Sequence, residues 1–208
     1  MTSSSGHATI RDARKRDCAA LAQLINIAGE GLPLYLWQQM TEAGEDPWEI
    51  GRDRAARDSG GFSYRNSVVA EVEGNIVGAL LGYPVAAEPD AIDPASTPPM
   101  FVPLLELENL AAGTWYVNAV ATFPDARGLG VGSQLMEWAE HRASALGLRG
   151  TSLIVSDANR GARRLYERLG YEETARRRMV KEQWQNTGDD WVLMIRDKPD
   201  WHRATPAV

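Results

Sequence analysis

The sequence predicts a mixed α/β domain, of the α+β kind in which strands pair as hairpins. Runs of β-branched and apolar residues come in neighbouring pairs joined by turn residues, a pattern typical of antiparallel hairpins. Segments with helical spacing separate these pairs, so strands and helices do not alternate strictly as they do in a doubly wound fold. The chain has 208 residues, of which 44% are hydrophobic. This length and composition are sufficient to form one buried hydrophobic core. We therefore expect a single domain over residues 1–208.

The first part of the chain reads as a strand followed by three helices. The expected elements are a strand at 8–13, a helix at 14–28, a break at 29–33, a helix at 34–40 and a helix from Pro47. Apolar residues recur at helical spacing in the first helix and predict its buried face. They are Cys18, Leu21, Leu24, Ile25 and Ala28. Cys18 is therefore expected to pack as a small core residue and not to react.

A hairpin and a proline-rich loop occupy the middle of the chain. Strands at Ser67–Glu73 and Ile76–Tyr83 are joined at Gly74-Asn75, a strong hairpin signal. Residues 84–103 then hold six of the eleven prolines, which favours a loop over a strand. This loop, 83–104 at its widest, is interpreted equally well as a lid over a substrate or as a merely flexible segment.

The second half of the chain is predicted to form two strand–helix pairs followed by two further strands. The expected elements are a strand at 114–122, a helix after Ser133, a strand at 152–155, a helix at 159–169, strands at 177–181 and 191–196, and a frayed tail at 198–208. The helix after Ser133 carries Leu135, Trp138, Ala139 and Leu146 at helical spacing and is expected to end at Gly147. The later helix carries Ala162, Leu165, Tyr166 and Leu169 on one face, and Gly170 closes it.

Composition excludes several functional classes. The formal net charge of −6 argues against a nucleic-acid partner. One cysteine allows no internal disulfide, and the N-terminus lacks a signal-peptide core, so a cytoplasmic protein is expected. No apolar run is long enough to cross a bilayer, so no membrane partner is expected. His7, His141 and His202 lack ligand spacing, and no metal site is predicted.

The most informative segment is the glycine-rich turn Arg127–Gln134, between a strand and a helix. Glycines let the backbone turn tightly and approach a ligand, and a helix start presents unpaired N–H groups. This arrangement is typical of a phosphate site. Two specific motifs are excluded: the turn lacks the lysine of a P-loop, and Ser133 stands where the dinucleotide fingerprint requires its third glycine.

Two segments in the right order resemble the GNAT superfamily of N-acetyltransferases. The first is Arg127-x-x-Gly130-x-Gly132, and the second is the stretch from Asn159 to Tyr171; the resemblance is strongest over 115–171. It implies a mostly antiparallel central sheet flanked by helices, with two strands splayed apart to hold coenzyme A. It also implies an acetyl-CoA-dependent transfer of an acetyl group directly to a primary amine. Homodimers are common among such proteins, so an assembly of two copies is an expectation as well.

The resemblance assigns the coenzyme A contacts residue by residue. Backbone groups of the turn would hold the pyrophosphate, and backbone groups of the preceding strand would pair with the pantetheine amides. The turn residues are Arg127, Gly128, Leu129, Gly130, Val131, Gly132 and Ser133, and the strand residues are Val120, Ala121 and Thr122. Asn159 would reach the pantetheine with its side-chain amide; the alternative is a helix N-cap. Arg127 would add charge to the phosphates; the alternative is an exposed cation over a loop.

The resemblance also assigns Tyr166 as the general acid that protonates the leaving thiolate; the alternative is a packed tyrosine. Some relatives place a glutamate five residues before the equivalent of Asn159, but here that residue is Ile154. Glu106, Glu108 and Glu30 are candidate bases, and none is assigned.

An acceptor pocket is expected around Glu30, Tyr35 and Trp37, although a core-packing helix explains the two aromatic residues as well. The sequence does not name the amine. The main alternative function is a non-catalytic acyl-CoA-binding sensor, and a nucleotide-binding oxidoreductase is disfavoured by the failed fingerprint.

Overall fold

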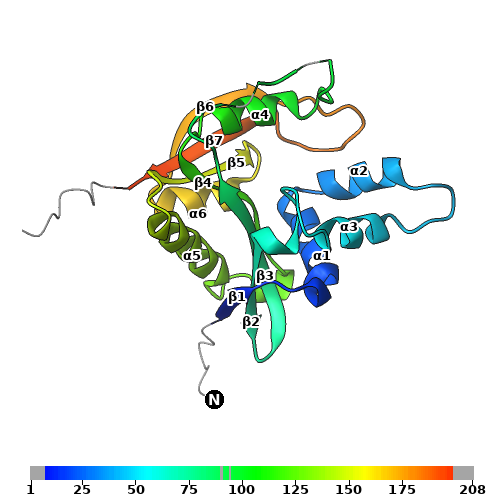
Figure 1. Ribbon diagram of the computed structural model, residues 1–208, viewed down its shortest axis with the longest axis horizontal. Helices are drawn as coiled ribbons and strands as arrows, with labels where there is room; N and C mark the ends of the chain where they lie inside the picture. Colours follow the sequence, from blue (N-terminus) through cyan, green and yellow to red (C-terminus); the bar gives the residue numbers. More distant parts are fainter. Residues whose placement is uncertain (1–7, 90, 94, 199–208) are drawn as a thin grey trace, which may run out of the picture. The chain divides into compact units, whose positions relative to one another are not determined.

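The computed structural model describes residues 8–89, 91–93 and 95–198 and confirms the predicted fold class (Figure 1). Seven strands form one sheet in the order β1-β2-β3-β4-β5-β7-β6. The pairs β1/β2, β2/β3, β5/β7 and β6/β7 are all antiparallel. The fold is therefore a mixed α/β fold with a mostly antiparallel sheet and flanking helices.

By its internal contacts the chain divides into two compact units. Unit 1 comprises the described residues of Met1–Tyr83, Val117–Ala139 and Lys181–Thr187. Unit 2 comprises the described residues of Pro84–Tyr116, Glu140–Val180 and Gly188–Val208. The strand β4 (Thr114–Thr122) and the helix α5 (Val131–Ala145) each contribute residues to both. The single domain expected from the sequence stays a prediction.

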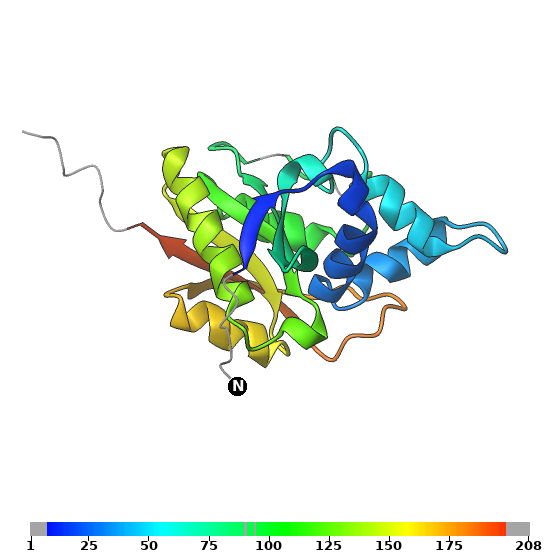
Figure 2. The same ribbon diagram turned by 90° about the horizontal axis from the view of Figure 1, so that it is seen from below.

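The N-terminal elements of unit 1 follow the sequence closely. They are β1 (Thr9–Asp12), a 3₁₀ turn (Lys15–Asp17), α1 (Cys18–Ala28), α2 (Leu32–Met40) and α3 (Pro47–Ala55). Figure 2 shows α2 and α3 side by side. The break predicted at 29–33 is too long, because α2 already begins at Leu32 with a proline in its first turn. Proline is tolerated there because an N–H group in the first turn of a helix has no acceptor within the helix, so its absence breaks no hydrogen bond.

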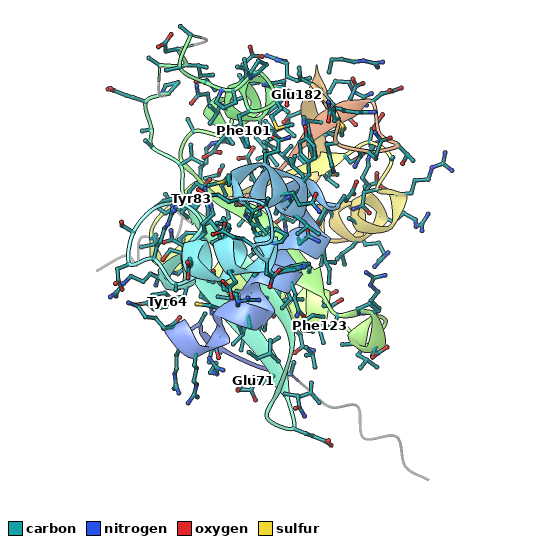
Figure 3. All side chains as sticks on the ribbon, turned by 90° about the vertical axis from the view of Figure 1, so that its right-hand side faces the viewer. Tyr64, Glu71, Tyr83, Phe101, Phe123 and Glu182 are labelled. Carbon is teal, nitrogen blue, oxygen red and sulfur yellow. The ribbon has the colours of Figure 1, made fainter. Side chains whose placement is uncertain are left out.

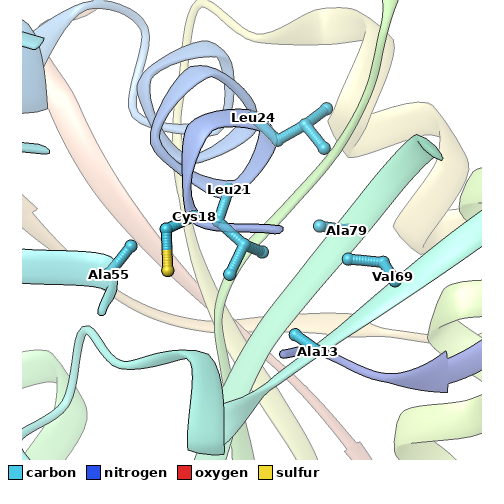
Figure 4. Packing of buried hydrophobic residues seen from close by; sticks show 7 residues of the cluster. All are labelled: Ala13, Cys18, Leu21, Leu24, Ala55, Val69 and Ala79. Carbon is cyan, nitrogen blue, oxygen red and sulfur yellow. The ribbon is translucent and has the colours of Figure 1, made fainter. Parts of the chain in front are cut away.

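The core of unit 1 packs α1 against the strands (Figure 4). Its buried members are Ala13, Cys18, Leu21, Leu24, Ala55, Val69 and Ala79. Cys18 is 6% exposed, and its burial raises the pKa of the thiol above the ordinary range. This confirms the core role predicted for Cys18, because a buried thiol forms little of the reactive thiolate.

The predicted hairpin is present, with its turn one residue earlier. The strands are β2 (Ser67–Val72) and β3 (Asn75–Pro84), and Val72 pairs with Asn75. The turn residues are Glu73 and Gly74, with φ of 51° and 80°, in place of the predicted Gly74-Asn75. Two consecutive positive φ values match the twist of the flanking strands.

Unit 2 is built on β5 (Gly150–Ser156), β6 (Glu172–Arg178) and β7 (Asp190–Asp197), with α4 (Val102–Asn109) and α6 (Arg160–Arg168). The strand predicted at 177–181 is wrong, since β6 ends at Arg178. The β6 strand lies at the edge of the sheet order and carries mostly charged, exposed residues. Charge on an edge strand is common because it discourages pairing with other chains, but it hides the apolar alternation that predicts strands.

Two helix boundaries also differ from the sequence predictions. The proline-rich loop ends at Phe101, because α4 uses Pro103 in its first turn. Leu146 lies beyond the end of α5 and is 46% exposed, so its assignment to the apolar helix face is wrong. Gly147, with φ of 69°, follows the helix end as predicted. Of the predicted tail, only Lys198 lies within the described residues.

None of the helices in the described part of the chain is both long and apolar enough to cross a membrane. No group of three or more His, Cys, Asp or Glu side chains among the described residues is arranged to hold a metal ion.

We predict that Gly51→Ala lowers the free energy of unfolding by about 1–3 kcal/mol. A Cβ atom at Gly51 would lie 2.5 Å from Cζ3 of the buried Trp37 ring, which overpacks the contact between α2 and α3. Denaturant unfolding measures the change. The control is Gly61→Ala, where the nearest atom is a Tyr83 ring carbon at 3.6 Å. Equal stability of the two variants would contradict the packing argument.

Candidate active site

The glycine-rich turn of unit 1 has a backbone that glycine alone adopts readily. A 3₁₀ turn at Pro124–Ala126 follows β4, and α5 starts at Val131. Between them, Gly128 and Gly130 have φ of 79° and 80°. Side chains with a Cβ atom pay a steric cost in this left-handed region. Two of the three alternate glycines, Gly128 and Gly130, are therefore explained by left-handed positions, while Gly132 lies inside α5.

The turn presents an open set of amides. The N–H groups of Val131, Gly132 and Ser133 have no acceptor within α5, because the first turn of a helix lacks one. The first helical bond runs from Gln134 N–H to Gly130 O, at 3.1 Å. Among the described residues, and apart from chain neighbours, no heavy atom lies within 4 Å of a Cβ built on Gly128. Unpaired donors, the helix dipole and open space together fit a phosphate.

The backbone of β3 at Gly78 lies very close to the residues on either side of this turn. A Cβ atom on Gly78 of β3 would lie 2.9 Å from Ala121 O and 3.2 Å from both Thr122 Cγ2 and Val131 Cγ1. Phe123 N–H also donates to Val77 O, at 2.9 Å. Gly78 thus lets β3 pack against the end of β4 and the start of α5. The sequence interpretation missed this residue, although a glycine inside an apolar strand signals such an approach.

The predicted pantetheine-pairing residues lie next to the turn. Val120, Ala121 and Thr122 are the last residues of β4, and all three are half-buried. Ala121 packs against the α1 core. Unit 1 therefore contains all the strand and turn residues that the sequence assigned to coenzyme A. The remaining assigned residue, Asn159, belongs to unit 2. The Arg127 side chain is exposed, as both interpretations of that residue require.

In unit 1, two of the candidate acceptor-binding residues, Glu30 and Tyr35, form hydrogen bonds with the same segment, 181–187. Asn186 Nδ2 donates to Glu30 Oε2 at 2.6 Å, and Trp184 Nε1 donates to Glu30 O at 3.3 Å. The Tyr35 hydroxyl donates to the Glu182 carboxylate at 3.5 Å and accepts from Gln183 N–H at 3.4 Å.

Two residues in this contact have strained backbones. Glu30 and Glu182, the latter labelled in Figure 3, have φ of 52° and 50°. Left-handed non-glycine residues tend to cluster at ligand-binding sites.

Trp37, the third acceptor candidate, packs in the interior of unit 1. It is 3% exposed, and its ring centroid lies 5.7 Å from that of Trp48 and 6.2 Å from that of Phe62. This is the packing that the core-helix interpretation describes. Trp37 thus packs α2 against α3 and Phe62.

The remaining candidates belong to unit 2. Asn159 is the N-cap of α6, and its Oδ1 accepts from Ala162 N–H at 3.1 Å, so the capping interpretation holds for this oxygen. Tyr166 is 7% exposed, and its ring centroid lies 6.0 Å from that of Tyr171. The Tyr171 hydroxyl lies 2.7 Å from Thr151 Oγ1. Burial raises the pKa of Tyr171 well above its ordinary value.

The carboxylates considered as bases differ in their surroundings. Glu106 Oε2 accepts from Arg177 Nε at 2.6 Å, so this carboxylate is engaged in an ion pair. Glu108 is half-buried near the end of α4. Ile154, at the position where some relatives carry glutamate, is half-buried in β5.

The fold and the open amide turn define an α/β protein with a strand–turn–helix whose free amides suit a phosphate. The sequence matches the model of the acetyltransferase (GNAT) family over residues 33–171, and the chain belongs to this family. One similar protein is an uncharacterized N-acetyltransferase of Methanocaldococcus jannaschii. It is 27% identical over 133 residues, which cover 64% of this chain and 66% of that protein. The match thus spans just under two thirds of the length of this relative.

Solved structures share the fold at low sequence identity. A crystal structure of an acetyltransferase has a TM-score of 0.62 and 22% identity, covering 91% of this chain and 98% of that one. An N-acetyltransferase from Staphylococcus aureus Mu50 has a TM-score of 0.61 and 18% identity, covering 90% and 100%. The ribosomal-protein-S18-alanine N-acetyltransferase of Escherichia coli has a TM-score of 0.54 and 17% identity, covering 91% and 92%.

We predict that Asn159→Ala lowers the free energy of unfolding by about 1 kcal/mol, because α6 loses its N-cap. Asn159→Asp should leave the stability nearly unchanged, since a carboxylate oxygen caps the same N–H group. Denaturant unfolding measures both variants. If Asn159→Ala were as stable as the original chain, the capping bond would contribute nothing.

Proposed function

We propose that the protein transfers an acetyl group from acetyl-CoA directly to a primary amine. The observation that carries the proposal is the open amide turn at 128–133, in a chain of a family that uses acetyl-CoA. Its N–H groups and helix dipole suit a pyrophosphate, and glycine at 128 and 130 leaves room for the phosphate oxygens. Arg127, exposed beside the turn, adds positive charge.

The pantetheine arm is proposed to continue along β4. Its amides are spaced much like those of a peptide, so they suit backbone pairing with Val120, Ala121 and Thr122. The Asn159 amide nitrogen is proposed as a further donor to the arm, while its oxygen caps α6. Because capping fixes this side chain, the donor is oriented before the ligand binds.

In the proposed reaction the amine nitrogen attacks the thioester carbon, the new C–N bond forms, and the C–S bond breaks. Tyr166 donates its hydroxyl proton to the departing thiolate, and water accepts the proton that the amine loses. No covalent enzyme intermediate is proposed. Cys18 supports this direct route, because it is buried in the α1 core with a raised thiol pKa.

The body of the acceptor molecule is proposed to bind beside Glu30 and Tyr35, with Trp37 packed behind them in α2. Glu30 and Glu182 place two carboxylates on the contact with segment 181–187, which favours an acceptor that carries positive charge. None of the candidate bases Glu30, Glu106 and Glu108 is assigned, and Ile154 replaces the glutamate of some relatives. The proton is proposed to leave through water.

We predict amine-dependent release of CoA from acetyl-CoA, with Tyr166→Phe lowering turnover about 100-fold or more because the thiolate loses its acid. The assay uses L-alaninamide, n-butylamine and spermidine as amines, and a thiol reagent detects CoA. Tyr171→Phe is the control: it also removes a buried hydroxyl, but one bonded to Thr151.

Two results would count against this prediction. Normal turnover by Tyr166→Phe would remove this residue from the mechanism. Binding of acetyl-CoA without release by any amine would instead favour an acyl-CoA-binding module.

We predict that Gly130→Leu abolishes binding of CoA in calorimetry, because a side chain enters the phosphate site and strains a left-handed residue. The matched control is Gly74→Leu in the β2–β3 turn. Gly74 and Gly130 have the same φ of 80°, and no described atom lies within 4 Å of a Cβ on Gly74 apart from its chain neighbours. The control should lose similar stability and keep its CoA affinity. Unchanged affinity of Gly130→Leu would refute the phosphate site.

A further inference from the structure

A polar side chain is exposed in the middle of an interior strand. β4 lies between β3 and β5 in the sheet order. Along β4, Thr114–Val117 and Ala119 are buried, whereas Asn118 is exposed. Interior strands covered by helices normally carry apolar residues. Asn118 therefore marks a point where the central strand is open to a ligand or to water.

The Asn118 amide has a defined orientation. Its Nδ2 donates to the Tyr83 hydroxyl at 3.5 Å. Tyr83 lies at the end of β3 (Figure 3), and its ring borders Gly61, whose Cβ position is 3.6 Å from Tyr83 Cε1. The nitrogen and oxygen of an amide point in different directions, so Oδ1 faces away from Tyr83. This leaves a carbonyl oxygen oriented by unit 1 itself.

The place of Asn118 along β4 connects it with the reaction, and this step rests on the proposed function. The pyrophosphate turn follows the C-terminal end of β4, and the pantetheine arm would pair with residues 122 to 120. The arm therefore runs toward the N-terminal end of the strand, with its thioester last. Asn118 is two residues beyond Val120, about 7 Å along a strand. Asn118 therefore lies beyond the pantetheine-pairing residues, on the side of the strand end toward which the thioester points.

We propose that Asn118 binds the attacking amine, with its Oδ1 accepting one N–H, and that Tyr83 positions the amide. A neutral amine can donate one N–H to Asn118 and still direct its lone pair at the thioester. The uncharged carbonyl oxygen matters here, because a carboxylate would raise the pKa of the amine and hold its lone pair protonated. Asn118 makes and breaks no bond; the protons move as in the proposed transfer.

A bisubstrate conjugate tests this contact without turnover. In the conjugate the CoA sulfur is joined through an acetyl group to n-butylamine, so that its amide N–H occupies the place of the attacking amine. Calorimetry on the full chain measures the affinities for CoA and for the conjugate. Asn118→Ala should weaken the conjugate about tenfold, the effect of one lost hydrogen bond. Its affinity for CoA should stay within about twofold.

Three further variants separate binding from folding. Asn118→Asp keeps an acceptor oxygen and should restore most of the conjugate affinity. Tyr83→Phe removes the positioning hydroxyl and should weaken the conjugate less than Asn118→Ala does. Asn75→Ala alters another exposed asparagine, in the first position of β3, and should leave both affinities unchanged. Thermal unfolding of each variant shows whether it is folded.

The outcomes distinguish this inference from the proposed function. If Asn118→Ala binds the conjugate as tightly as the original chain does, while both bind CoA, the role of Asn118 alone is overturned. A parallel loss of CoA and conjugate affinity in Asn118→Ala would also overturn it, because the effect would not be specific to the amine. If the original chain binds neither ligand, the proposed function falls, and this inference falls with it.

Discussion

The close approach at Gly78 is the contact on which the candidate site most depends. A side chain there would meet Ala121 O, Thr122 Cγ2 and Val131 Cγ1 within 3.2 Å. These three atoms belong to the end of β4 and to the first residue of α5. The missing Cβ thus lets β3 hold the end of the strand and the start of the helix together. A phosphate site made of backbone amides needs such support, because no side chain can move to correct a misplaced turn.

A second contact of unit 1 joins segments far apart in the sequence. Segment 181–187 reaches Glu30 through Asn186 and Trp184, and it reaches Tyr35 through Glu182 and Gln183. Two left-handed glutamates, each costing on the order of 1 kcal/mol, are held by these bonds. The β2–β3 turn holds a third left-handed glutamate, Glu73, so this backbone conformation alone does not mark a site. What distinguishes Glu30 and Glu182 is that both carboxylates accept hydrogen bonds across this contact.

The sequence correctly predicted those features, such as strand bounds and helix caps, that depend on residues close together in the chain. β4 was predicted at 114–122 and lies at Thr114–Thr122, and Asn159 and Gly170 bracket α6 as capping residues do. The failures concern distant partners. β6 was misplaced because its register is set by β7 and not by its own charged sequence. Gly78 and Asn118 went unnoticed because a close approach and an opening in the sheet arise only when separate strands come together.

The proposed chemistry puts a limit on the acceptor that follows from the residues near the reaction. Ile154 offers no base, Glu106 is paired with Arg177, and the amide at Asn118 does not take up protons. With water as the proposed proton acceptor and no carboxylate acting as a base, the enzyme draws on amine that is already neutral. At pH 7 about one in ten α-amino groups of pKa ~8 is neutral, against about one in 2,500 lysine-like amines of pKa ~10.4. This difference of roughly 250-fold favours α-amines or other weakly basic amines, unless the carboxylates of Glu30 and Glu182 concentrate a more basic acceptor enough to offset it.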